Sequence, residues 1–283
     1  IEGLEADGIS VSSDAGIQGL AQLTNAAVAA TSSGNAVSTA NADQLQGADL
    51  NAIDVDGIAS IAGQTTLSNS ASSETVAGGT GGAQGETMAT ASLTQADGLL
   101  IGPDKLIGAE AALDVSSDAT LTGLASIDNA ATAAATSGKS KAFSEADFVG
   151  GARINTADIG GVGSITGQIN FAGSADASNV TDGDSTADTE LENAQGLQAQ
   201  DSIRVSSDAG LTGISGIDLT ASSASTGAAN TATKAIADAE AKTLQGAELS
   251  NYTEIGGVGT IGGQIDFNGS AASSNVTGEA TAT

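Results

Sequence analysis

The chain has 283 residues, of which 34 are acidic and 7 basic, giving a net charge of −27; it contains neither histidine nor cysteine. This composition excludes imidazole and thiol chemistry, and the negative charge opposes binding to nucleic acid and to anionic membranes. Charged residues make up only 14% of the chain and apolar residues 40%, so it is also not a highly charged segment of the kind that stays disordered.

Repeated strings organise the whole chain. The string VSSDA occurs three times, each time before a similar apolar stretch, at 11–15, 115–119 and 205–209. A second string, of the SITGQINF type, also occurs three times, starting at Ser60, Ser164 and Thr260. Stacked repeats form long surfaces more often than active-site clefts. We expect three pairs of units, at 1–97 with a Gly/Ser/Thr-rich insertion at 77–90, at 98–190 and at 191–283.

Each pair contains two related units. The segment ISGIDLTASSAS at 214–225 resembles the stretch that begins at Ile261, which aligns three residues at steps of 48, namely Ile169, Ile217 and Ile265. The earlier equivalents follow at steps of 42, 62 and 42, namely Leu23, Thr65 and Ile127. The insertion at 77–90 explains the long step. The sequence therefore predicts about six half-repeats of 42–62 residues.

Side chains alternate with a period of two, which is the pattern of β-strands. Alanine occupies every odd position of 235–241, and similar alternation occurs at 36–45, 88–96 and 261–271. Residues 231–243 could instead form a helix, because Ala and Lys favour helices. The recurrence of the alternation, the abundant Ser and Thr and the single proline favour strands. Glycines in LQGADL, FVGGARI, LQGAEL and GGVG are expected to form bends and bulges.

The predicted fold is all-β. Two architectures fit the repeated units: a β-solenoid whose coils stack along one axis, or a series of small β-sandwich modules. The variation in unit length disfavours a solenoid with a fixed coil length. In either architecture the buried strand faces are expected to contain two equivalent sets of side chains, Ile165, Ile169 and Phe171, and Ile261, Ile265 and Phe267.

The sequence predicts neither an enzyme nor a cofactor. It contains no GxSxG, no SxxK and no P-loop, and its few aromatic residues offer little for a sugar site. The aspartates of VSSDA, which are Asp14, Asp118 and Asp208, are expected to accept hydrogen bonds in turns. Two short acidic strings have the local spacing of calcium ligands, although no EF-hand or GGxGxD array surrounds them. Their residues are the candidate Ca²⁺ ligands, Asp54, Asp56, Asp182 and Asp184.

The two ends of the chain match two parts of one unit. Its first residues resemble the end of the linker at 191–209, and TGEATAT stops where an Ala-alternating strand would begin. Placed tail to head, 280–283 and 1–9 would restore most of a unit. Such a head-to-tail contact forms filaments when it does not close, and an added strand gains backbone hydrogen bonds. The expected assembly residues are Ile1, Leu4, Ile9, Ala280, Ala282 and Thr283. The alternative is a boundary within a longer array.

The abundance of Gly, Ala, Ser and Thr, with few aromatic residues and no Cys or His, resembles repetitive secreted prokaryotic surface and filament proteins of the adhesin, S-layer or extracellular fibre type. The resemblance implies an extracellular or cell-surface location and copies of the same chain as partners. No segment is apolar enough to cross a bilayer. We therefore expect a structural subunit of a filament or surface layer that assembles head to tail by strand complementation. The alternative is a passive stalk segment of a large adhesin or phage fibre, and an ice-binding solenoid is a third hypothesis.

Overall fold

The computed structural model describes residues 1–76, 85–102, 112–181, 183–226, 233–249, 252–276 and 278–283. Within these ranges the regular structure consists of strands, without a helix, so the all-β prediction is confirmed. The strands form two sheets, and neighbouring strands in both sheets are parallel.

The first sheet has six strands of 17 residues each, and their order in space follows their order in the chain. They are β3 (Ala15–Thr31), β6 (Ala59–Thr75), β9 (Ala119–Ala135), β11 (Gly163–Asn179), β13 (Ala209–Ser225) and β16 (Gly259–Asn275). Each residue of one strand pairs with one residue of the next, so the alternating side chains keep the same face throughout this sheet.

The second, larger sheet contains five long strands, β4 (Ala36–Asn51), β7 (Gly85–Ile101), β10 (Gly138–Ile159), β12 (Ser185–Val205) and β14 (Lys234–Glu248). Short strands flank it, β1 (Glu2–Asp7) beside β4 and β17 (Glu279–Ala282) beside β14. Four more short strands continue its rows near the turns, β2 (Ser10–Val11), β5 (Ile53–Val55), β8 (Leu113–Val115) and β15 (Tyr252–Ile255).

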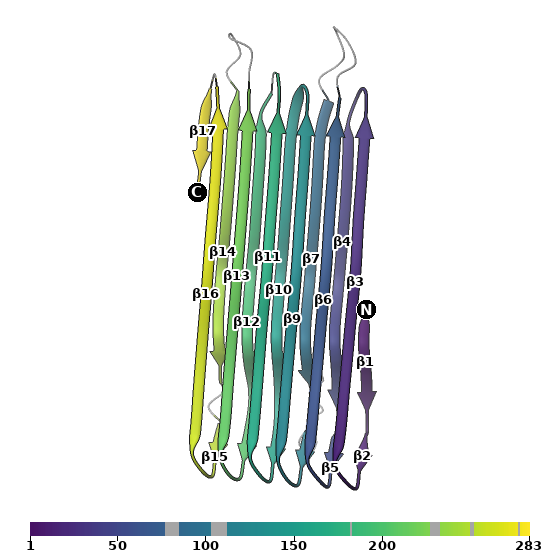
Figure 1. Cartoon of the computed structure of the whole chain (residues 1–283), viewed down its shortest axis with the longest axis vertical. Helices are drawn as coiled ribbons and strands as arrows, with labels where there is room; N and C mark the ends of the chain where they lie inside the picture. The colour runs from purple at the N-terminus through teal and green to yellow at the C-terminus, as the bar shows by residue number, and fades with distance from the viewer. Residues whose placement is uncertain (77–84, 103–111, 182, 227–232, 250–251, 277) are drawn as a thin grey trace.

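The chain alternates between the two sheets, and the strands of one sheet run opposite to those of the other (Figure 1). We call one strand of the six-stranded sheet, with the strands of the larger sheet that follow it, a unit. The units number six, from unit 1 (β3 to β5) to unit 6 (β16 and β17). Both sheets continue through all six. The boundaries expected at 97/98 and 190/191 lie within β7 and β12, and the division into three pairs stays a prediction.

The strands predicted from the alternation at 36–45, 88–96, 235–241 and 261–271 are confirmed, as parts of β4, β7, β14 and β16. The helical alternative for the Ala-rich segment is wrong for its described residues from Lys234 onward, which belong to β14. Its alternating alanines explain the outcome, since Ala235 and Ala237 are fully buried against the other sheet.

The alignment of the half-repeats differs from the one expected. Ile217 pairs with Phe171 and Phe267, whereas Ile169 and Ile265 pair with Ser215. Thr65 likewise pairs with residues other than Leu23 and Ile127, which both align with Leu67. The predicted row therefore mixed two rows that lie two residues apart on the same sheet face. Two residues along a strand keep a side chain on the same face, so the alternation alone could not separate them.

The insertion expected at 77–90 is only partly correct. Residues 85–90 belong to β7, and residues 77–84 lie outside the described residues. A second segment, between Ile101 and Leu113, also lengthens unit 2, whereas in unit 1 a single residue, Ala52, separates β4 from β5. The extra length of unit 2 is thus divided between both of its connections.

The interior between the sheets is layered along the strands. The layer next to the turns that precede the strands of the six-stranded sheet contains Ile, Leu and Val side chains such as Ile61 and Leu121. A second layer contains Leu67 and Phe171. The third layer consists of alanines, among them Ala131. Alanine makes up the whole third layer and part of the first two, so small side chains fill much of the interior, in keeping with a chain that has four Phe and no Trp.

Between the first and second layers, both sheets carry a row of glycines. The row in the six-stranded sheet is Gly19, Gly63, Gly123, Gly167, Gly213 and Gly263. The facing row in the larger sheet is Gly3, Gly47, Gly98, Gly151, Gly196 and Gly246. In units 1 to 5, a Cβ on the first glycine would lie within 3.0 Å of the carbonyl oxygen of the second. The glycines of LQGADL and LQGAEL thus allow the backbones to approach closely within strands, and they do not end them.

Candidate functional site

The two ends of the stack of units expose apolar side chains that are buried in the central units. At the C-terminal end, β16 is the outermost strand of its sheet, and β17 covers only the part of its unit next to Lys234–Ala237. The inward-facing side chains of β16 are consequently exposed, by 57% for Ile261, 47% for Ile265 and 45% for Phe267. Their expected burial is wrong, while that of Ile165, Ile169 and Phe171 in unit 4 is confirmed. The difference arises because unit 6 has no neighbour on its outer side.

At the N-terminal end, β1 covers the complementary part of the face. It pairs with β4 from Gln46 to Asn51, and Leu4 and Ile9 pack partly against the apolar layer next to the turns. The N-terminal amine donates a hydrogen bond to Gln44 O at 2.7 Å, while the Ile1 side chain remains 58% exposed. Leu23 on β3, beyond the reach of β1, is half-buried.

The expected assembly residues of the C-terminus, Ala280, Ala282 and Thr283, are all exposed and lie in or next to β17. The Thr283 N–H donates to Ala237 O at 3.0 Å, which fixes the last residue against β14. Each terminal strand thus pairs on one side with a strand of its own chain, β1 with β4 and β17 with β14. Their part in assembly stays a prediction. In Figure 1, β17 lies near the upper end of one side and β1 near the lower end of the other.

The aspartates of VSSDA form hydrogen bonds between neighbouring units. The Ile58 N–H donates to Asp14 Oδ1 at 2.9 Å. Equivalent bonds of 2.7 Å join the Val162 N–H to Asp118 Oδ1 and the Val258 N–H to Asp208 Oδ1. The prediction that these carboxylates accept turn hydrogen bonds is therefore confirmed. Each bond joins a VSSDA unit to the following unit, whose turn has glycine in place of this string.

The structure does not bring the candidate calcium ligands together. Asp54 lies in β5 near the turn at 56–58, whereas Asp184 directly precedes β12, at the opposite end of the strands. Asp184 Oδ1 accepts a hydrogen bond from the Lys234 N–H at 3.0 Å. Asp182 lies outside the described residues. Within the described part, no three acidic side chains are placed to hold a metal ion, and calcium binding stays a prediction.

Carboxylates gather on the outer face of the larger sheet. Glu190 pairs directly with Glu145 and Glu240, and Asp188 pairs with Asp238. Burial and then the neighbouring carboxylates, with Asp238 first, raise the pKa of Asp188. Burial and Glu190 raise the pKa of Glu145 in the same way. Like charges directly opposite in a sheet destabilise it, so the charged forms of Asp188 and Glu145 oppose folding at neutral pH. Lys242 offsets part of the charge of Glu190, with which it forms an ion pair.

One buried ion pair lies on the same sheet. Asp97 is fully buried, and its Oδ2 accepts hydrogen bonds from Arg153 Nη1 at 3.1 Å and Gln95 Nε2 at 2.5 Å. Burial raises the pKa of Asp97, although the nearby Arg153 acts in the opposite direction. Arg153 also lies over the ring of Phe148, 4.9 Å from its centroid. Gly150 leaves the space that the Asp97 carboxylate occupies.

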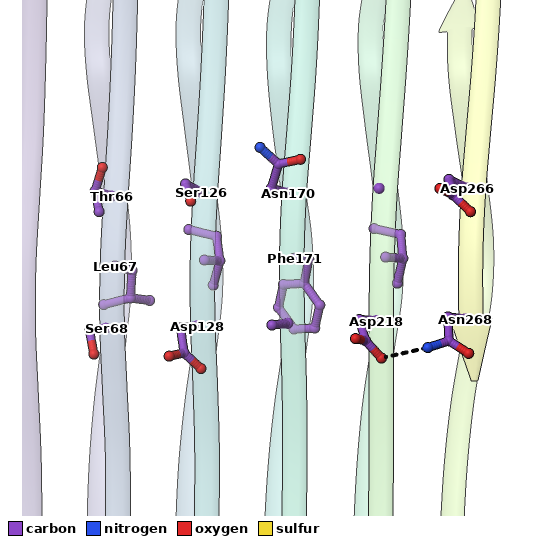
Figure 2. Close-up of a pocket in the computed structure, with 14 residues that line it drawn as sticks. Thr66, Leu67, Ser68, Ser126, Asp128, Asn170, Phe171, Asp218, Asp266 and Asn268 are labelled. Carbon is purple, nitrogen blue, oxygen red and sulfur yellow. Dashed lines mark hydrogen bonds between the residues drawn. The ribbon is translucent and has the colours of Figure 1, made fainter. Parts of the chain in front are cut away.

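A shallow groove crosses the outer face of the six-stranded sheet, over β6, β9, β11, β13 and β16 (Figure 2). Hydroxyl, amide and carboxylate groups line its two sides, and Asn268 Nδ2 donates to Asp218 Oδ1 at 3.2 Å across one edge. Its one aromatic lining residue, Phe171, has a buried ring. The groove thus lacks the exposed ring that a sugar site normally offers, and we assign no ligand to it.

A scan against protein-family models gave no match, and searches of curated proteins and of solved structures found no significant match. Across the described ranges, the structure also has no helix of the length and apolarity needed to cross a membrane.

Proposed function

We propose that the chain is a β-solenoid that serves as a structural subunit of an extracellular filament or surface layer, with copies joined end to end. The alternation of one chain between two continuous parallel sheets supports the solenoid architecture. The proposed location rests on the composition described above, and the proposed partners are further copies of the chain.

The main support for this proposal is the exposed outer side of the last unit, unit 6, and the exposed edge strand of the first unit, β3. Stacked-repeat proteins normally need end units with a polar outer face to remain soluble and separate. Here β16 exposes Ile261, Ile265 and Phe267 where such a cap would lie. The outermost strands are also long and nearly uncharged, since β3 has no charged residue and β16 has only Asp266. Long, uncharged sheet edges are templates for pairing with another chain.

The two end faces differ from each other, so a contact between them is heterologous and can repeat without limit. In the resulting filament all strands lie across the axis. Adjacent strands lie about 4.8 Å apart, so the six units of one chain would add about 29 Å of length. Only backbone pairing and apolar packing are required at each joint, which suits a chain without disulfides or a metal centre in its described part.

Negative-stain electron microscopy tests the proposal with four versions of the chain. The unmodified chain is expected to form uniform filaments, and a version lacking residues 1–9 is expected to remain monomeric. Ile265→Asp places a charge on the exposed apolar face and is expected to abolish filaments. Ala272→Asp adds the same charge to the outer face of the same strand, opposite Ser222, and is expected to leave them intact.

Short single rods for the unmodified chain, at every concentration and salt condition tried, would contradict the subunit proposal and favour a passive stalk segment. Filaments that persist in Ile265→Asp would show that the C-terminal face is not the contact. Analytical ultracentrifugation of the same four proteins provides an independent measure of assembly.

A further inference from the structure

The two glycine rows define how two copies would align. In units 1 to 5, the glycine of the six-stranded sheet packs against the glycine of the larger sheet that follows it in the same unit, as Gly213 does against the carbonyl oxygen of Gly246. Gly263 of unit 6 has no such partner. The atom nearest to a Cβ on Gly263 would be Ala247 N, at 3.1 Å. One position of the glycine arrangement is therefore empty at the C-terminal face.

The N-terminal strand holds the reverse arrangement. Gly3 occupies the glycine row of the larger sheet, beside Gly47, because Glu2 pairs with Gln46 and Leu4 with Ala48. A Cβ on Gly3 would collide with the backbone of Leu20 in unit 1, as one on Gly47 would collide with Gln64 in unit 2. Gly3 therefore lies where the larger-sheet glycine of a unit lies, but its own chain has no six-stranded-sheet glycine to face it. Gly263 has the opposite deficiency, because it lacks a facing glycine from the larger sheet.

Resting on the proposed function, we propose that the joint is a single unit shared by two copies in one fixed register. β16 of one copy pairs in parallel with β3 of the next, with Gly263 opposite Gly19. In the larger sheet, β1 of the next copy pairs with the free edge of β14, with Gly3 opposite Gly246. The partner is a second copy of this chain, and both glycine rows then continue across the joint without a break.

The two terminal strands fit into one strand position without overlap. β17 pairs with β14 at Lys234–Ala237, and Thr283 reaches the level of Asp238. Continuing the pairing of the larger sheet places Ile1 of the next copy at the level of Leu244. Residues 239–243 remain between the two ends. β17 and β1 thus cover different parts of the same β14 edge, which is required for both to occupy the joint.

The turns also alternate correctly across this joint. A glycine turn after Ile255 leads into unit 6, and VSSDA at 11–15 leads into the first unit of the next copy, as at the transitions from unit 2 to 3 and from unit 4 to 5. At those transitions Ser116 N donates to Val55 O at 3.0 Å, and Ser206 N donates to Ile159 O at 2.8 Å. The equivalent bond at the joint would run from Ser12 N to Ile255 O.

Disulfide trapping tests this register, since the chain has no cysteine of its own. The double variant with Ala26→Cys and Ser270→Cys places the two thiols on adjacent strands at one level of the joint. Both residues are exposed on the outer face, and they lie on opposite edge strands, so a bond must join two copies. The matched control combines Ser270→Cys with Ala30→Cys, which is displaced by about 13 Å along the strand, beyond the reach of a disulfide.

A second double variant, with Glu5→Cys and Glu248→Cys, tests the position of β1, because the pairing continues from Glu248 to Glu5. After oxidation, non-reducing electrophoresis is expected to show multimers for both predicted pairs and monomer for the displaced control. If filaments form but the displaced pair links, or either predicted pair fails to link, the register is wrong while the proposed function stands. If the unmodified chain forms no filaments and no pair links, the proposed function fails as well.

Discussion

Gly123 faces the carbonyl oxygen of Gly151 across the two sheets, at a distance that leaves no room for a side chain. The contact is between backbone atoms of two central strands, β9 and β10, so neither partner can rotate away. Five units repeat it. This contact lets the sheets approach closely between two apolar layers, and it suggests a direct test of the fold.

Gly123→Ala is expected to destabilise the chain by about 3 kcal/mol or to prevent folding, because overpacking against rigid neighbours typically costs 1–3 kcal/mol and more where nothing can move. The matched control is Gly210→Ala, since no atom lies within 4 Å of the added Cβ and the backbone is not left-handed. That control is expected to be neutral or up to about 1 kcal/mol more stable. Thermal unfolding followed by circular dichroism, at concentrations where the chain is monomeric, measures both. Equal effects would contradict the close approach of the sheets.

Asn129 holds the two sheets together through its side chain, which is fully buried. Its Nδ2 donates to Ala91 O and Glu145 O, both at 3.0 Å, and its Oδ1 accepts from Asn69 Nδ2 at 2.9 Å. Asn129→Leu keeps a similar volume but removes these bonds.

We expect Asn129→Leu to cost about 2–4 kcal/mol, because the buried partners lose their hydrogen bonds. The control Asn170→Leu changes an exposed asparagine on the outer face and is expected to stay within about 0.5 kcal/mol. Urea unfolding of both variants provides the comparison. A loss below 1 kcal/mol for Asn129→Leu would show that these bonds contribute little.

The Asp97–Arg153 pair predicts a strong coupling between two substitutions. Arg153→Met leaves the buried Asp97 carboxylate without its cation and is expected to cost about 3–5 kcal/mol at pH 7. Adding Asp97→Gln is expected to restore most of this loss, because Gln occupies the equivalent position at Gln46, Gln195 and Gln245. A double-mutant cycle in urea measures the coupling, and additive losses would refute it.

The raised pKa of Asp188 predicts how stability depends on pH. A carboxyl group with a raised pKa in the folded state binds its proton more tightly when folded, so its charged form destabilises the fold at neutral pH. Stability from Asp188 and Glu145 should therefore increase as the pH falls from 7 toward the ordinary values of 3.8 for Asp and 4.5 for Glu.

Asp188→Asn is expected to raise the melting temperature at pH 7 and to reduce its increase on acidification, with an effect of roughly 0.5 kcal/mol from relief of the opposed charges. Asp266→Asn is the control, since Asp266 lies on the other sheet opposite Gly216. A melting temperature of Asp188→Asn that is unchanged at pH 7 would contradict the electrostatic origin.

The sequence by itself determined the strand content, the six units and the absence of histidine and cysteine. These properties are local: alternation within ten residues places alanines such as Ala235 and Ala237 on one face, whatever the strand pairs with. That Asp118 accepts a hydrogen bond in a turn was also predictable, because short acidic side chains commonly do so. Its donor, the Val162 N–H in the turn of the following unit, became known only from the tertiary structure.

The register between units depended on the tertiary structure. Ile217 was aligned with Ile169 by local resemblance, but it pairs with Phe171 because each strand is set by the turn that precedes it. Counting from the turn would have given the correct row, since Leu23, Ile127 and Ile217 each lie eight residues after the last residue of VSSDA. The glycine row of the six-stranded sheet follows a similar count, since each glycine lies four residues after the start of its strand.

Only the tertiary structure decided which of the apolar strand faces are buried. Ile165 and Ile261 have closely similar sequence environments, yet the first is fully buried and the second is 57% exposed. Burial depends on whether another unit lies on each side, and a repeating sequence carries the same pattern in its central and terminal units. The same reason applies to the two ends: the sequence predicts that 280–283 and 1–9 complete one unit, but only the stacked sheets show which side chains of β16 remain exposed.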